Sequence, residues 1–471
     1  MHLVSAVSAR SRIVAVLALL GGPVAGAQGE LTLAHLTAVP QSLLVNPATP
    51  QWSRFSVGAS AGAAYHNTAF ELGLLELEGE ALAEALTAAA LGSRAADAVE
   101  LDGRAGLVEA TLQTPVGLFS LGLAQRVAGR VRPGGAALPF AYLGAESVAA
   151  RPQEDLLAEL HVDGGALLEL GLGFQQALRR REDITVGGRL KLLRGQAHAD
   201  AGTLSATARE VDEGGTPRVV ELTGEARTAG LADAIDGRAG ARSILRSGQG
   251  FGAALDAGVH ARLDERWSVG ASVLDVGFVR WGGGVRRYTL AAEARDWGGV
   301  EAVGGAVTDL SDVGAGLRIL DEESGGTNAV TDGGSYATAL PSRLLLQAAY
   351  ALDDAPRAST LGGVYRVRLG GGGPRHGAAV SLNWRGLPWL DLSGSYGLDG
   401  GSLHLVGAAA AFTLGPVQLF AVSDNALGAA DYQRLGTTSV LVGLNVVLGE
   451  RRTDEAVCPP MGGRRRPRWR R

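Results

Sequence analysis

The chain has 471 residues, a net charge of −5 and 70 glycines, well above the ~7% glycine of an average protein. The modest charge argues against a nucleic-acid partner, and the single cysteine, Cys458, excludes an internal disulfide. After residue 27, no apolar stretch reaches the ~20 residues that a transmembrane helix needs.

Residues 1–27 have the three parts of a secretory signal peptide. Arg10 and Arg12 precede the apolar run Ile13–Leu20, and small residues at 25–27 match the site that signal peptidase recognises. The apolar run is too short for a membrane-spanning helix. The sequence therefore predicts export, cleavage after Ala27 and a mature chain that begins at Gln28.

Apolar and polar residues alternate from Arg54 onward in segments of about ten residues, the pattern of β-strands. The clearest segments are 168–175, 184–192, 361–369, 378–385 and 440–448. An outer-membrane barrel alternates in this way because one face of each strand meets lipid and the other lines the lumen. A soluble β-sandwich or solenoid gives the same alternation with its apolar face inward. Strand length and the glycines spread through the strands favour the barrel.

The predicted fold is all-β, a transmembrane antiparallel β-barrel over residues 52–450. We expect about 14 strands, within a range of roughly 12 to 16. Leucines and alanines predict one short helix at 80–93. Residues 28–51 precede the first strand, and the segment 451–471 is rich in Pro, Gly and Arg, a composition that predicts a disordered basic tail.

Four stretches carry a resemblance to a known family: Val39–Pro50, Ile184–Ala197, Gly248–Trp281 and Ser335–Tyr350. In order and spacing they resemble an uncharacterised family of predicted outer-membrane barrels, found largely in Bacteroidetes-type bacteria. That family is distantly similar to the long-chain fatty-acid transporter barrels. The resemblance covers most of residues 39–450, and it implies a barrel in the outer membrane of a Gram-negative bacterium.

Two functions follow from the resemblance and stay open. One is a channel or transporter for a small hydrophobic or amphipathic solute. The other is a structural or secretion-associated barrel that acts through a protein partner in the outer membrane or periplasm. Both rest on analogy between folds. Outer-membrane lipid is the partner expected in either case.

Asn46-Pro47-Ala48 is a candidate plug motif. In the fatty-acid transporter barrels, an Asn-Pro-Ala segment near the mature N-terminus belongs to a plug in the lumen. The resemblance therefore implies that residues 28–51 partly plug this barrel. An Asx-Pro turn that merely starts the first strand explains the same residues equally well.

The segment around Asp275 contains a local conflict. Strict alternation from Trp267 places Asp275 on the lipid face, where a carboxylate is unfavourable. A bulge near Leu274 would turn Asp275 into the lumen, with Arg280 or another arginine as its partner. We predict polar lumen residues at Asp275, Arg280, Arg189 and Lys191, and an interfacial aromatic girdle that includes Trp267, Trp281 and Trp384. One bulge cannot satisfy both predictions, because Trp267 and Trp281 share parity.

Signals for catalysis, metals and cofactors are weak. The only lysine, Lys191, precedes Leu192, which excludes a Gly-Lys-Ser/Thr phosphate loop. No histidines or cysteines have zinc-site spacing, and the acidic residues between 309 and 332 lack the spacing of a calcium loop. The segment 270–275 does not fit a hydrolase elbow. The sequence predicts no enzymatic activity, no metal and no cofactor.

Overall fold

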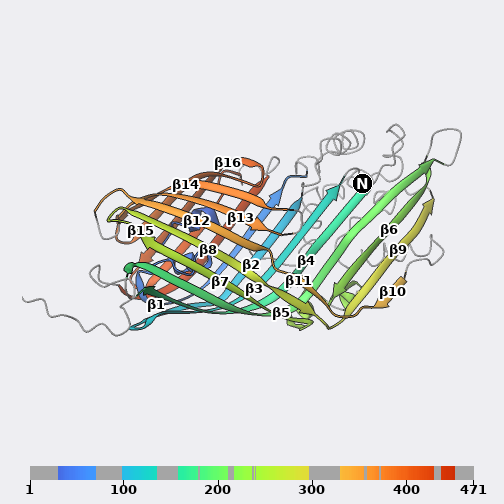
Figure 1. Cartoon of the computed structure of the whole chain (residues 1–471), viewed down its shortest axis with the longest axis horizontal. Coiled ribbons are helices and arrows are strands. Elements are labelled where there is room, and N and C mark those ends of the chain that lie inside the picture. The colour runs from blue at the N-terminus through green and yellow to red at the C-terminus, as the bar shows by residue number, and fades with distance from the viewer. Residues whose placement is uncertain are drawn as a thin grey trace, which may run out of the picture.

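The computed structural model of the protein describes residues 30–69, 98–134, 158–178, 181–210, 217–235, 238, 240–295, 329–354, 358–370, 373–428 and 436–450. The predicted signal peptide, the predicted helix at 80–93 and the predicted basic tail lie outside the described residues. The described part is a closed antiparallel β-barrel, as predicted, with a short N-terminal segment in its interior (Figure 1).

The barrel is apolar outside and polar inside. On β15 (Leu390–Asp399), Leu392 and Tyr396 are 39% and 52% exposed, whereas Ser393 and Ser395 between and beside them are 5% and 8% exposed. A soluble sandwich buries its apolar residues and exposes its polar ones, so its strands have the opposite arrangement. The outward leucines instead form the belt that a barrel presents to hydrocarbon. The soluble alternative is therefore wrong.

Within the described residues, eighteen strand segments form one sheet. The segments not yet given are β1 (Ser53–Asn67), β2 (Val99–Thr114), β3 (Gly117–Gly134), β4 (Ala158–Leu178), β5 (Arg181–Glu210), β6 (Pro217–Ala229), β7 (Gly250–Arg262), β8 (Trp267–Trp281), β9 (Val285–Arg295), β10 (Ala329–Asp332), β11 (Tyr336–Ala339), β12 (Ser342–Ala351), β13 (Thr360–Leu369), β14 (Arg375–Leu387), β16 (Ser402–Leu414), β17 (Val417–Ser423) and β18 (Thr437–Glu450).

Several segments are parts of one interrupted strand. The C-terminal part of β5 pairs with β6 and its N-terminal part pairs with β7. β6 and β7 therefore form a single crossing of the barrel wall. In the same way β8 and β9 form one crossing. β10, β11 and β12 together form the next crossing, in which β10 pairs with β9 and the other two pair with β8. The barrel thus has 14 strands, which confirms the predicted number. It closes where β1 pairs with both β2 and β18.

The two ends of the barrel differ. The short connections 115–116, 179–180, 263–266, 388–389 and 415–416 share one end, called here the turn end. The long connections 68–98, 135–157, 296–328 and 424–436 share the other, the loop end. At the loop end β5, β6 and β9 reach beyond the other strands, at the right of Figure 1. Short turns on one side and long loops on the other are typical of outer-membrane barrels.

Exposed aromatic residues gather near the turn end. Trp267 contacts Tyr350 in a tilted arrangement with ring centroids 5.0 Å apart, and Phe119 contacts Phe174 in the same way at the same distance. Trp384 is 41% exposed near the end of β14. These rings lie where the apolar belt meets the turns, the usual height of an interfacial girdle.

The helices in the described residues are short. They are α2 (Glu30–Leu33), the 3-10 helix η1 (Pro40–Leu44), α6 (Ala232–Ile235) and α7 (Ala241–Arg246). Of the helices in this part of the chain, none has the length and apolarity needed to span a membrane.

Candidate functional site

Residues 30–50, called here the plug, lie in the lumen of the barrel (Figure 1). Leu33, Val39 and Val45 are completely buried. With other plug residues, they pack on inward-facing wall residues from several strands: Leu274, Leu345, Val364, Phe420 and Leu441. Burial of such side chains contributes about 1.5–3 kcal/mol each. The plug and the inner face of the wall therefore form one hydrophobic core.

Polar groups of the wall bind the plug backbone. The carboxylate of Asp424 accepts hydrogen bonds from the backbone N–H groups of Leu31 and Thr32, at 3.2 and 2.8 Å. Arg385 donates to the carbonyl of His35 at 3.1 Å, and Gln418 donates to the carbonyl of Ala38 at 3.0 Å. Because the plug has little regular structure, these side chains satisfy backbone groups that would otherwise be unpaired.

Asn46-Pro47-Ala48 makes an Asx turn and also contacts the wall. The Asn46 side-chain oxygen accepts the N–H of Ala48 at 2.9 Å, and its amide donates to the Val259 carbonyl at 3.2 Å. Two strand glycines make room for the motif. A Cβ on Gly258 would lie 2.2 Å from the Asn46 side-chain oxygen, and one on Gly187 would lie 2.2 Å from the Pro47 carbonyl oxygen. The motif thus forms an Asx turn that lies against β5 and β7 in the lumen.

A β-bulge lies at Leu274 and Asp275, where the sequence conflict predicted one. The pairing of β7 with β8 shifts between Leu255 and Ala257. Leu274 and Asp275 of β8 therefore both lie opposite the single residue Asp256 of β7. Asp275 has a φ of 58°, and the structure buries it completely. A non-glycine residue seldom adopts a positive φ, and Asp is among those that tolerate it best. The bulge points Asp275 into the lumen.

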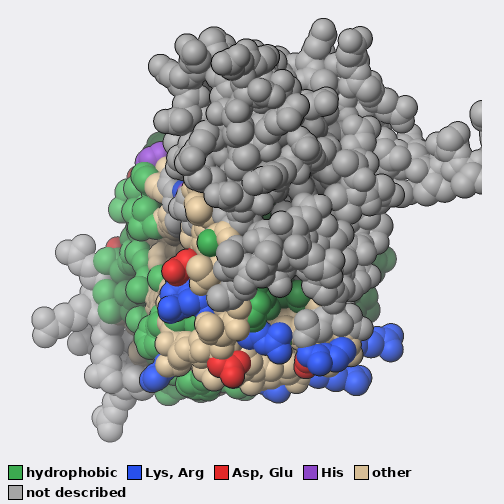
Figure 2. Space-filling view, turned by 90° about the vertical axis from the view of Figure 1, so that its right-hand side faces the viewer, with side chains coloured by type: hydrophobic (Ala, Val, Ile, Leu, Met, Phe, Trp, Pro, Cys, Tyr) green, Lys and Arg blue, Asp and Glu red, His purple; other side chains and the backbone are tan. Residues whose placement is uncertain are grey.

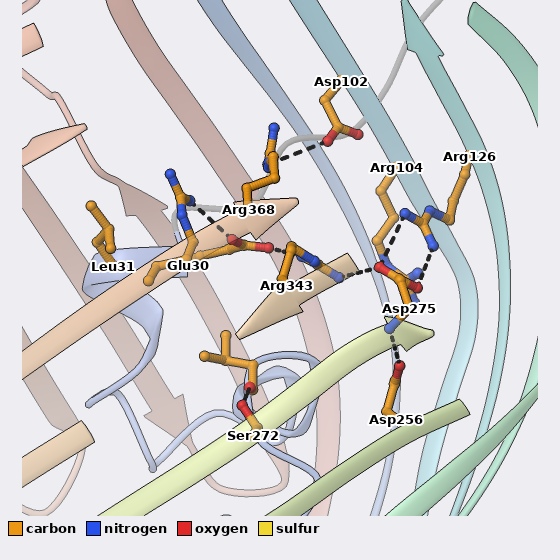
Figure 3. Close-up of polar contacts among 12 residues, drawn as sticks. Glu30, Leu31, Asp102, Arg104, Arg126, Asp256, Ser272, Asp275, Arg343 and Arg368 are labelled. Atoms are coloured by element: carbon orange, nitrogen blue, oxygen red, sulfur yellow. Dashed lines mark hydrogen bonds and ion pairs between the residues drawn. The ribbon is translucent and has the colours of Figure 1, made fainter. Parts of the chain in front are cut away.

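Three cations surround Asp275 (Figure 3). Its carboxylate lies 2.9 Å from Arg126, 2.6 Å from Lys191 and 2.5 Å from Arg343. Lys191 also contacts Asp256 at 2.8 Å. A buried carboxylate stays ionised only when cations and hydrogen-bond donors replace its water. Asp275 is therefore the centre of a buried ionic site.

The ion pairs continue on both sides of Asp275. Arg126 contacts Glu169 at 3.0 Å, and Arg104 joins Glu169 to Glu109, whose carboxylate accepts a hydrogen bond from the plug residue Gln41. On the other side Arg343 contacts Glu30, which also contacts Arg366 at 2.9 Å. Arg366 in turn contacts Asp399 at 2.6 Å. We call this connected set the lumen ion-pair network, and Glu30 and Gln41 tie the plug to it.

A cavity of about 500 Å³, called here the chamber, lies between this network and the loop end. Its apolar lining includes Leu167, Val279, Trp281, Leu340 and Pro341. Its charged lining carries Arg126, Arg130, Arg343 and Arg368 together with the carboxylates of Glu100, Asp102 and Asp163. Viewed from the loop end, the barrel shows basic and acidic side chains close together (Figure 2). The chamber therefore offers an apolar surface beside a charged one.

Two of the predicted positions are wrong. Arg280 is exposed on the outer wall, not in the lumen, and donates to Ser335 at 3.2 Å. Trp281 is 2% exposed and faces the chamber, so it is not a girdle residue. The cause is the single bulge, which reverses the alternation once. It turns Asp275 inward and exchanges the faces of Arg280 and Trp281.

The other predicted residues lie on both faces of the wall. Lys191 and Arg189 are buried on the lumen face of β5, and Arg189 lines the lumen beside Glu169. Trp267 and Trp384 are exposed on the outer wall. Sequence reasoning missed Arg126, Glu169, Arg343, Arg366 and Glu30. For Glu169 and Arg366 the signal was a charged residue between apolar neighbours on a strand, but the pairing of all five residues depends on the tertiary structure.

No group of three or more potential metal ligands gathers in the part of the chain that the structure describes. The carboxylates that lie closest together share cations from the protein itself, as Asp275 and Asp256 share Lys191.

Solved structures with a similar outline include the Pseudomonas putida toluene transporter TodX, with 11% identity, a TM-score of 0.40 and coverage of 86% of this chain and 92% of that chain. A TodX monoaromatic hydrocarbon channel variant, deltaS2, has 10% identity, a TM-score of 0.44 and coverage of 89% and 99%. A FadL homologue of Pseudomonas aeruginosa has 11% identity, a TM-score of 0.41 and coverage of 86% and 93%. No curated protein matches the chain. The model of a family of unknown function, DUF5723, matches residues 50–424, and the chain belongs to this family.

Proposed function

We propose that this barrel moves a small hydrophobic or amphipathic solute across the outer membrane of a Gram-negative bacterium, to which the signal peptide 1–27 directs it. The chamber is the observation that carries the proposal. One side of it, around Trp281 and Leu340, is apolar, and the other carries Arg126 and Arg368. A solute with an apolar body and a polar group satisfies both sides.

Passage beyond the chamber requires the plug to move. The plug lies in the lumen beside the chamber, where Thr32 binds Ser395 of β15 and Gln41 binds Asn445 of β18. The contact between Thr32 and Ser395 is the most useful for a test, because two short side chains meet there with their oxygens 2.8 Å apart. Cysteines at these positions are placed to form a disulfide, whose S–S bond is about 2.05 Å long.

The experiment compares solute flux with the plug free and with the plug locked. Thr32→Cys and Ser395→Cys are combined with Cys458→Ser, and the protein is reconstituted into liposomes. The probe is labelled octanesulfonate, an amphiphile with a permanent charge that crosses a bare bilayer slowly. We expect flux above that of empty liposomes in reductant, no such flux after oxidation, and recovery when reductant is added again.

The control places a disulfide in the wall alone. Ser56 and Thr111 are directly opposite on β1 and β2, with their side-chain oxygens 2.6 Å apart. Ser56→Cys with Thr111→Cys should leave flux unchanged in both redox states. If the reduced plug variant and the unmodified protein carry no more probe than empty liposomes, the transport proposal fails.

A structural or secretion-associated barrel that acts through a protein partner is the second candidate function. The packed lower lumen favours it, because Glu30 and Gln41 hold the plug in a network of buried charges. In that case none of the forms above should carry solute. Cross-linking in intact cells should then join the barrel to one envelope protein in a fixed ratio.

A further inference from the structure

The outer wall carries an inserted segment near the loop end. Residues 230–249 interrupt the crossing formed by β6 and β7 and contain α6 and α7. The segment packs on β5: Ser247 donates to the Gln196 carbonyl at 2.8 Å, and Arg194 donates to the Arg246 carbonyl at 2.9 Å. Leu190, Leu192 and Arg194 alternate on the exposed face of β5, so the inserted segment lies outside the barrel.

Arg194 and Arg280 belong to one rung of the outer wall. Both are directly paired with Phe251, which is 66% exposed. Toward the turn end, the same outward faces carry exposed Leu192 and Leu255. The two arginines therefore stand at the upper border of the apolar belt, the height at which lipid headgroups begin.

Two further arginines lie on the inserted segment. Arg242 and Arg246, both on α7, are exposed, and the Arg246 carbonyl is the group that Arg194 binds. The four residues Arg194, Arg242, Arg246 and Arg280 form what we call the outer-wall arginine cluster. Within the described residues, no carboxylate lies within ion-pair distance of any of the four, in contrast to the paired arginines of the lumen.

The rung itself offers the arginines no acidic neighbour. Beyond Arg194 it continues with Leu168 and Gln125, and beyond Arg280 with Ala337. Arg194 and Arg280 flank Phe251, and Arg194 binds the backbone of α7, which carries the other two arginines. Like charges on adjoining elements repel, and an anion between them relieves the repulsion. Guanidinium groups match phosphate oxygens in a two-pronged geometry, and the lipid beside this wall supplies such groups at this height.

We propose that the outer-wall arginine cluster binds the phosphate groups of an outer-leaflet lipid. Phe251 and the leucines below it contact the acyl chains, while the guanidinium groups hold the headgroup. This surface lies outside the wall and takes no part in the chamber, so the inference goes beyond the proposed transport function. It holds whether or not the lumen conducts a solute.

Lipid retention in detergent tests the proposal. The purified barrel is incubated with a bisphosphorylated lipid A or with its dephosphorylated form, and bound lipid is counted by native mass spectrometry. An arginine near an anionic lipid surface strengthens binding by about fivefold. Changing Arg194, Arg242, Arg246 and Arg280 together to Gln should lower retention of the phosphorylated lipid at least about tenfold, and leave the dephosphorylated form unchanged.

The matched control removes two exposed arginines at the turn end, Arg262→Gln with Arg266→Gln, and should retain lipid normally. The double variant Arg242→Gln with Arg246→Gln changes no strand and should lose part of the retention even if the quadruple variant misfolds. Equal retention of the two lipids by the unmodified protein, or unchanged retention in the double variant, would overturn the proposal. Displacement of the lipid by millimolar inorganic phosphate would overturn it in favour of a free anion.

Discussion

At the scale of single residues, Asp275 shows how the lumen tolerates charge. It is completely buried, and Arg126, Lys191 and Arg343 all contact its carboxylate. Its backbone N–H also donates to Asp256 at 2.7 Å. Each of the three cations keeps a second carboxylate partner, so the site is a branch point in a chain of alternating charges. Removing its charge should weaken all the ion pairs that meet at this site.

Asp275→Asn tests this branch point. Asn tolerates the positive φ and keeps the shape of the side chain, so the change removes mainly the charge. Loss of one member of a buried ionic site costs about 3 kcal/mol of the free energy of unfolding. The measurement is urea unfolding of the barrel in detergent. Asp354→Asn, which removes the exposed partner of Arg266, should cost at most about 1 kcal/mol, and equal losses in both variants would contradict the argument.

At the scale of elements, the plug has a titratable group of its own. Burial lowers the pKa of His35 from 6.5 to about 4, because the charged ring would lose its water. When the plug leaves the lumen, the ring regains water and its ordinary pKa. Above pH 6.5 His35 is neutral whether or not the plug is in the lumen, so the docked plug is not destabilised. As the pH falls from 6.5 toward 4, the free plug gains a proton that the docked plug does not, and binding of the plug to the lumen weakens. Burial raises the pKa of Asp424, so protonation of Asp424 in acid strengthens docking and opposes the effect of His35.

Acidification should loosen the plug through His35. At pH 4.5 the shift predicts that docking is weaker by about 2.5 kcal/mol. A nitroxide on the half-buried position Ala38, in a Cys458→Ser background, should report a larger mobile fraction at pH 4.5 than at pH 7.5. His35→Gln, which does not titrate, should abolish most of this difference. An unchanged pH response in that variant would assign the loosening to other groups of the plug or the wall and not to His35.

At the scale of the whole molecule, the arrangement of polar and apolar residues is the reverse of a soluble protein. Every crossing must hydrogen-bond to two neighbours, because lipid cannot satisfy free backbone groups. Pairing of β1 with β18 closes the sheet and removes its edges. Such closure makes the fold resistant to local unfolding, and only disruption of the whole sheet exposes the backbone.

A closed barrel predicts heat-modifiable migration. The expressed protein should be recovered in the outer-membrane fraction, and an unboiled sample in dodecyl sulfate should run as a compact band. Boiling should convert that band to the position of the unfolded 48.2 kDa chain, or of the chain shortened by signal cleavage. Recovery in a soluble fraction, or identical migration before and after boiling, would contradict the barrel.

Much of the wall could be predicted from the sequence, and much of the site could not. Leu170 and Leu172 alternate with Glu169 and Gly171, and this period alone indicated strands with one polar face. The same rule showed that Asp275 required a break in the pattern. It also misplaced Arg280 and Trp281, because parity after a bulge depends on how many residues the bulge adds.

The barrel class, the approximate number of strands and the location of the bulge could be read from the amino-acid pattern, because these depend on local periodicity and on the cost of a carboxylate in lipid. Only the tertiary structure decided that Arg126, Lys191 and Arg343 meet at Asp275, that Glu30 joins them from the plug, and that Arg194 and Arg280 share a rung outside. These contacts join residues that are far apart in the sequence. They depend on strand register and on closure of the sheet, which no local pattern encodes.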